Sequence, residues 1–216
     1  INNTDGIHLK RVLFVNHNLY PYELTGTPIS TLNHAVGIKN KGVEVAILIP
    51  STEVQSDFVK EINDGIVLYK VPHLDKYETF FKNIGETILN KYTYSIEKIR
   101  NDFHPDIVHI NDYVFMPDEI ISLFSKSGTY IIRNVCNTEE ICHLDSPVYF
   151  DGKSNVLCSG PDSADKCAKC FFNNVLKKNE DEINQSELEQ YTSKIQNRFD
   201  AIHSHYKKDV DGMIFT

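Results

Sequence analysis

The chain of 216 residues is 41% hydrophobic and 24% charged, which is typical of a globular protein with a substantial core. Its 22 Lys and Arg against 30 Asp and Glu give a net charge of −8. This balance argues against a nucleic-acid partner, because a duplex requires a basic surface. No apolar run approaches the roughly 18 residues that a transmembrane span needs.

Short segments rich in Val and Ile recur along the chain, and most are continuously apolar rather than alternating. Such strands are typical of a parallel sheet that is covered on both faces. We expect strands at Arg11–Asn16, Val43–Ile49, Ile66–Val71, Asp106–Asn111, Tyr130–Val135 and Gly212–Thr216.

Helices are expected between these strands. The first begins with Thr27 as the N-cap and Pro28 at the first helical position, and it ends before Gly42. A stripe of apolar residues at spacings of three and four predicts one long helix over Lys76–Phe103. The remaining helices are expected at Pro117–Lys126 and Leu188–Tyr206.

This alternation predicts an α/β fold built on a doubly wound, mostly parallel sheet. The segment of about 136–184 lacks convincing periodicity, and we expect an insertion with little core of its own rather than a separate domain. Residues 1–216 would then form a single domain. The last strand ends abruptly, so we also expect a longer protein to continue past Thr216.

Ligands of open α/β sheets bind at the carboxyl ends of the strands. The loop "ELTGTPIS" places Gly26 just before a helix N-terminus, where free N–H groups and the helix dipole favour a phosphate. The alternative is that Gly26 and Pro28 only shape a turn and a cap. The motifs GxGxxG and GxxxxGK[ST] are absent, which argues against a dehydrogenase or a P-loop kinase.

Polar residues also follow two later strands. His109, Asn111 and Asp112 end one of them, where polar groups are costly unless they are paired or face a site. A neighbouring loop could equally satisfy His109. Asp112, with Glu139 or Glu140 beyond the next strand, could supply a general base.

The five cysteines fall close together in the sequence, and their odd number without a signal peptide indicates a reducing, cytoplasmic compartment. Four of them would suit a structural zinc ion that staples the insertion. Disulfides, free thiols and an iron–sulfur cluster are the alternatives. The proposed zinc ligands are Cys142, Cys158, Cys167 and Cys170.

Taken in order, these segments resemble the N-terminal Rossmann-like domain of glycosyltransferase family 4, retaining enzymes of GT-B fold. "RVLFVNHNLYPYELTGTPISTLNHAVGIKNKGVEVAILIP" is similar to the family's first βαβ unit, and "HPDIVHIND" resembles its "PDIVH" strand. "YIIRNVCNTEEIC" resembles the next strand and the active-site loop after it. "CSGPDSADKCAKC" is similar to the Cys-rich insertion of some members.

The resemblance implies a cleft between two such domains. This domain would hold the acceptor, and a C-terminal domain without a counterpart in this chain would hold most of the nucleotide-sugar donor. The chain alone would then be inactive. The resemblance also implies that the Gly26 loop lies against the donor diphosphate. The donor- or acceptor-binding candidates are Thr25, Gly26, Thr27, His109 and Asp112.

Many family members carry a His after the fifth strand that faces the reacting sugar, and Cys136 stands at that position here. The catalytic candidates are therefore Cys136, Asn137 and Glu139. The implied activity is a hexosyltransferase-type transfer to a glycan, lipid or protein acceptor, in the cytoplasm or peripherally at the inner face of the membrane. The alternatives are a GT-B-like sugar-nucleotide epimerase and a non-catalytic, metal-stapled binding module.

Overall fold

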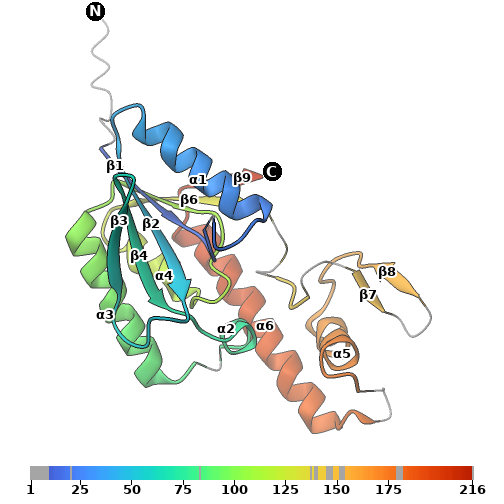
Figure 1. Cartoon of the computed structure of the whole chain (residues 1–216). Coiled ribbons are helices and arrows are strands. Elements are labelled where there is room, and N and C mark those ends of the chain that lie inside the picture. The colour runs from blue at the N-terminus through green and yellow to red at the C-terminus, as the bar shows by residue number, and fades with distance from the viewer. Residues whose placement is uncertain are drawn as a thin grey trace, which may run out of the picture. The chain divides into compact units, whose positions relative to one another are not determined.

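The computed structural model describes residues 10–19, 21–82, 84–136, 138, 141–144, 148–150, 154–178 and 182–215. The chain divides into two compact units, whose elements Figure 1 shows. Unit 1 comprises residues 1–74, 85–136 and 209–216, and unit 2 comprises 75–84 and 137–208. Unit 2 thus holds the Cys-rich segment together with residues from outside the range of about 136–184 expected for the insertion.

Unit 1 is built on a seven-stranded sheet of order β3-β4-β2-β1-β5-β6-β9. All neighbouring strands are parallel except the antiparallel pair of β3 and β4. The predicted α/β fold with a mostly parallel, doubly wound sheet is therefore confirmed. The strands are β1 (Arg11–Val15), β2 (Glu44–Ser51), β3 (Val59–Asn63), β4 (Ile66–Pro72), β5 (Ile107–Ile110), β6 (Tyr130–Val135) and β9 (Gly212–Phe215).

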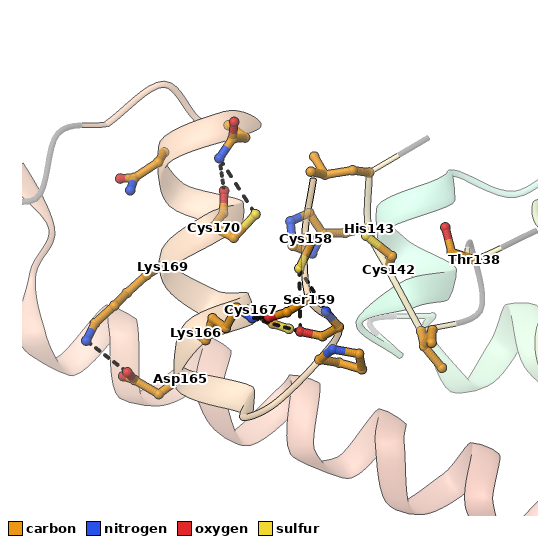
Figure 2. Close-up of a pocket in the computed structure, with 16 residues that line it drawn as sticks. Thr138, Cys142, His143, Cys158, Ser159, Asp165, Lys166, Cys167, Lys169 and Cys170 are labelled. Carbon is orange, nitrogen blue, oxygen red and sulfur yellow. Dashed lines mark hydrogen bonds and ion pairs between the residues drawn. The ribbon is translucent and has the colours of Figure 1, made fainter. Parts of the chain in front are cut away.

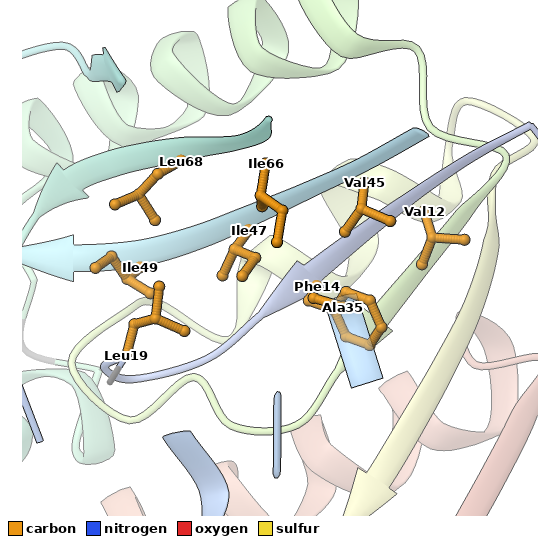
Figure 3. Packing of buried hydrophobic residues seen from close by; sticks show 9 residues of the cluster. All are labelled: Val12, Phe14, Leu19, Ala35, Val45, Ile47, Ile49, Ile66 and Leu68. Carbon is orange, nitrogen blue, oxygen red and sulfur yellow. The ribbon is translucent and has the colours of Figure 1, made fainter. Parts of the chain in front are cut away.

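Both faces of the central strands are buried, which explains their continuous apolar sequences. On one face, Phe14 and Ile47 pack with Ala35 of helix α1 (Gly26–Lys39), as Figure 3 shows. On the other face, Tyr69 of β4 meets Phe103 of helix α3 (Glu86–Phe103), with ring centroids 6.5 Å apart. Helix α4 (Glu119–Ser125) packs against α3 and β6.

Helix α1 begins earlier than predicted. Its first residue is Gly26 and its N-cap is Thr25, whose side chain makes no capping hydrogen bond. The prediction of Thr27 as the cap and Pro28 at the first position is therefore wrong. Pro28 is the third helical residue, where its missing N–H still has no partner inside the helix.

The long helix predicted over Lys76–Phe103 is wrong, because two helices occupy this range. Helix α2 (Lys76–Phe80) begins after Asp75, whose carboxylate accepts two N–H groups of the first turn. Helix α3 begins after Gly85 as its N-cap. Between them Lys82 has a φ of 51°, which ends a right-handed helix. The apolar stripe continues across this break, so periodicity alone does not reveal it.

Unit 2 contains α2, β7 (Val148–Phe150), β8 (Asn155–Leu157), α5 (Ala164–Asn174) and α6 (Gln185–Lys208). Strands β7 and β8 are antiparallel, and α5 packs against α6. An aromatic core lies between α5, α6 and the end of α2. In it, the ring of Phe171 stacks on that of Tyr191 with centroids 5.2 Å apart, and it meets the ring of Phe81 edge-on with centroids 4.7 Å apart. The segment expected to be an insertion therefore shares its core with α2 and α6, which lie outside the range of about 136–184. Among the described residues, no helix is long and apolar enough to cross a membrane.

Candidate active site and thiol pocket

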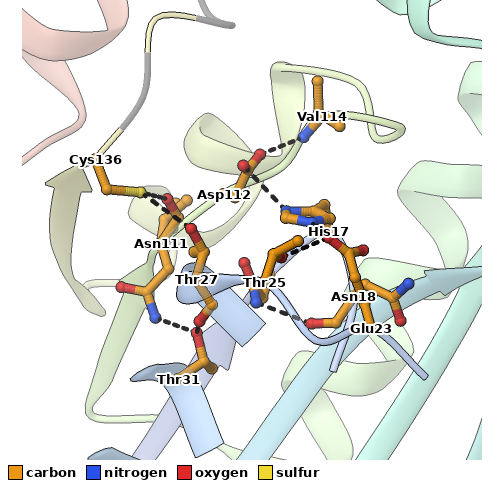
Figure 4. A network of polar contacts seen from close by, with 12 residues as sticks. His17, Asn18, Glu23, Thr25, Thr27, Thr31, Asn111, Asp112, Val114 and Cys136 are labelled. Carbon is orange, nitrogen blue, oxygen red and sulfur yellow. Dashed lines mark hydrogen bonds and ion pairs between the residues drawn. The ribbon is translucent and has the colours of Figure 1, made fainter. Parts of the chain in front are cut away.

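The strand order of unit 1 reverses at β1, because the chain continues to β2 on one side and β5 lies on the other. Ligands of such sheets bind in the crevice at the carboxyl ends of these two strands. His17 follows β1 and Asp112 follows β5, and Figure 4 shows the two side chains meeting there. The expected position of the site thus carries a charged pair in this chain.

His17 lies between two carboxylates. Its Nδ1 is 3.1 Å from Oδ2 of Asp112, and its Nε2 is 3.2 Å from Oε1 of Glu23. Glu23 also accepts the hydroxyl of Thr25 at 2.5 Å, which ties the loop before α1 to His17.

This arrangement keeps His17 protonated. Burial by itself would lower the pKa of the imidazole, but the interactions with Asp112 and then Glu23 outweigh it and raise the pKa to about 9. The pKa of Asp112 is lowered, because His17 overcomes the cost of burying the carboxylate. Near neutral pH the site therefore contains an imidazolium held by two carboxylates.

We expect the free energy of unfolding to depend on pH through the raised pKa of His17. Because the folded-state pKa of His17 exceeds its unfolded value, the stabilisation is fully present below pH 6.5 and is lost as the pH rises through about 9. A shift of this size corresponds to on the order of 3 kcal/mol. Urea unfolding between pH 6 and pH 10 should show this loss in the wild type and not in His17→Gln.

The matched control is His34→Gln, since His34 is exposed on α1. Its pH profile should run parallel to that of the wild type. If the profile of His17→Gln also does so, the imidazole is not held charged by Asp112 and Glu23.

A second network joins the ends of three predicted segments. The amide of Asn111 donates to the hydroxyl of Thr31 at 2.8 Å, and that hydroxyl donates to the carbonyl of Thr27 at 2.8 Å. The thiol of Cys136 lies 3.7 Å from the hydroxyl of Thr27 and donates to the carbonyl of Asn111 at 3.5 Å. Thr27 and Cys136, both candidates from the sequence, therefore lie together at the sheet edge.

The buried side chain of Arg133 in β6 forms hydrogen bonds with the end of β5. Its side chain is fully buried, and Nη1 donates to the carbonyls of Ile110 at 2.8 Å and Asn111 at 2.6 Å, and also to that of Asn134. Its guanidinium lies 5.4 Å from the centre of the Tyr113 ring. The strand pattern "YIIRNV" gave no sign of this role.

The N-terminus of α1 is open at Gly26. A Cβ added there would meet no atom within 4 Å, and the φ angle of Gly26 is not in the left-handed region. The amides of Gly26 and Thr27 have no partner inside the helix, because they belong to its first turn. The helix end can therefore receive an anion, as its dipole favours.

The other site candidates fall in different places. His109 lies within β5 rather than at its end, and its ring packs on Phe14 at 5.2 Å. Burial lowers the pKa of His109 to about 4, with smaller effects from His34 and Arg133. Asn137, Glu139 and Glu140 lie outside the described residues.

A cavity of about 290 Å³ opens beside His17 at the same sheet edge. Lys70 lines this cavity, and its Nζ forms an ion pair with Oε1 of Glu61 at 2.9 Å. His73 also lines it and stacks on Phe115 at 4.2 Å. In the sequence, Lys70 reads as an ordinary strand residue.

The four cysteines predicted to bind zinc line one cavity of about 600 Å³ in unit 2, as Figure 2 shows. None of the five cysteines is disulfide-bonded in the part of the chain that the structure describes. Burial, and then the neighbouring thiols, raise the pKa of Cys167 and of Cys170 to about 11. As the side chains stand, no three His, Cys, Asp or Glu among the described residues form a set that could hold a metal ion.

No protein-family model and no curated protein matches the chain. Among solved structures, the catalytic domain of starch synthase IV from Arabidopsis thaliana bound to ADP and acarbose has a TM-score of 0.40 and 15% identity, covering 61% of this chain and 34% of that one. A trehalose-6-phosphate structure from E. coli bound with UDP-2-fluoro glucose has a TM-score of 0.36 and 14% identity, covering 58% and 33%. The chain spans about a third of these structures, and similarity at these scores is too weak to establish a shared fold.

Proposed function

We propose that this chain is the acceptor-side domain of a retaining glycosyltransferase of family 4. The enzyme would transfer a sugar from a nucleotide-sugar donor to a glycan, lipid or protein acceptor. The observation that carries the proposal is the meeting of Thr27, Asn111 and Cys136 at the carboxyl edge of the sheet. Thr27 lies in the segment that resembles the family's first βαβ unit, and Asn111 lies in "HPDIVHIND", which resembles its "PDIVH" strand. Cys136 lies in "YIIRNVCNTEEIC", which resembles the next strand and the active-site loop.

The roles follow from the geometry of each group. The open amides at the start of α1, from Gly26 and Thr27, would bind the donor diphosphate, flanked by Thr25. Cys136 would lie beside the reacting sugar. Asp112, kept as a carboxylate by His17, would accept a hydrogen bond or a proton from the acceptor hydroxyl.

Two further parts of the proposal concern groups outside the described residues. Asn137 and Glu139 would share the catalytic role of Cys136, and a C-terminal domain would hold most of the donor. Zinc would enter only as a staple of unit 2, because four thiolates leave no open coordination position for catalysis. We propose a cytoplasmic enzyme.

We expect this chain alone to show no sugar transfer. Without a donor domain neither the sugar nor the diphosphate is positioned, and positioning and electrostatics supply most of the rate. The test compares this chain with the longer protein that we propose contains it, across a panel of nucleotide-sugars and acceptors. Robust transfer by the chain alone would contradict the two-domain account, and epimer formation by the longer protein would favour the epimerase instead.

A further inference from the structure

The thiol pocket is lined by residues of unit 2 alone. Cys167 and Cys170 lie one turn apart on α5, and Cys142 and Cys158 lie on segments across the cavity from that helix (Figure 2). Four thiols from three separate segments therefore converge on one space. Four cysteines, two of them in a Cys-x-x-Cys pair, are a ligand set that structural zinc sites use.

Polar groups around the cavity are directed at two of the cysteine sulfurs. The backbone N–H of Gly160 points to Sγ of Cys158 at 3.4 Å, and Nδ2 of Asn174 points to Sγ of Cys170 at 3.6 Å. Lys166 Nζ donates to the carbonyl of Gly160 at 2.9 Å, which ties the Cys158 segment to α5. These N–H groups can donate hydrogen bonds to sulfur that is bound to a metal, as partners outside the ligand set do in metal sites.

One further group at the cavity wall lacks a partner. His143 is 2% exposed, lines the cavity, and its Nε2 makes no hydrogen bond within the described residues. Its ring lies against Phe80 and Phe171. Its position at the wall places a ring nitrogen within the same lining as the four thiols.

We propose that Cys142, Cys158, Cys167 and Cys170 close around one zinc ion, and that His143 donates a hydrogen bond to one of the bound sulfurs. As the side chains stand, the four thiols of the described residues do not form a set that could hold a metal ion, so binding requires them to move closer together. Each of the four thiols loses its proton as its sulfur binds, and four protons are released for each zinc ion taken up.

The first test uses the protein purified under reducing conditions without added metal. Elemental analysis should find about one zinc per chain. After removal of zinc, cobalt should bind in its place and give the visible spectrum of a tetrahedral thiolate complex. A zinc titration of the apoprotein at pH 7 should release four protons.

Two variants assign the ligands. Cys158→Ser should lose most of the zinc, whereas Cys136→Ser, which changes the one cysteine outside the pocket, should retain about one zinc per chain. Four titratable thiols without bound metal, iron with inorganic sulfide, or disulfides in the freshly reduced protein would each overturn the proposal. Because the wild-type measurements decide between these outcomes, a poorly folding variant does not weaken the test.

Discussion

Replacing Gly26 with valine in the longer protein is expected to reduce sugar transfer by at least about 100-fold while the melting temperature stays nearly unchanged. A side chain at this position would project into the open space before α1, where we propose that the diphosphate binds. Misplacement of a reacting group by about 1 Å is enough for a loss of this size. Initial rates and thermal unfolding of the same preparation measure both quantities.

The same helix offers a matched control. Gly37 also has no atom within 4 Å of an added Cβ, but it is exposed near the far end of α1. Gly37→Val should leave the rate of transfer within about twofold, since this position is far from the first turn. Normal kinetics for Gly26→Val would show that the loop is only a turn and a cap.

Replacing Arg133 with methionine is expected to destabilise unit 1 by about 3 kcal/mol or more. The substitution keeps much of the buried volume but removes the donor shared by three carbonyl groups. Each buried acceptor left without a partner costs about 1–3 kcal/mol. The melting temperature of a protein of this size should fall by roughly 6–12 °C, measured by calorimetry or circular dichroism.

Arg100→Met is the corresponding control. Arg100 is partly buried on α3, and its Nη1 donates a long hydrogen bond of 3.5 Å to the carbonyl of Leu123. The loss of this contact should cost less than about 1 kcal/mol. If Arg133→Met is as stable as Arg100→Met, Arg133 does not hold the end of β5 in the way that the structure shows.

Sequence reasoning located the strands of the sheet because burial on both faces demands continuous apolar segments, as in "RVLFV" and "VAILIP". It missed β3, whose residues are all exposed and carry no apolar pattern. It also joined α2 and α3, because their apolar stripes are in phase and the break depends on the backbone at Lys82 and Gly85. Backbone breaks of this kind leave little trace in periodicity.

The site was partly predictable for a similar reason. The rule that ligands bind at the carboxyl ends of parallel strands is the reason why Gly26 and Asp112 were proposed from their positions alone. It did not identify His17 or Arg133, because their roles depend on which strands are neighbours in space. His109 was drawn into the prediction by its position near a strand end, although its ring packs on Phe14.

The central claim is that a nucleotide-sugar binds at the carboxyl edge of the β1–β5 pair. Hydrogen exchange on the longer protein, with and without a donor whose binding is confirmed by calorimetry, tests it most directly. The amides of Gly26 and Thr27, and those of 111–116, should exchange more slowly with donor, and the amide of Gly37 near the far end of α1 should not change. A bound donor that leaves the start of α1 unprotected would contradict the account.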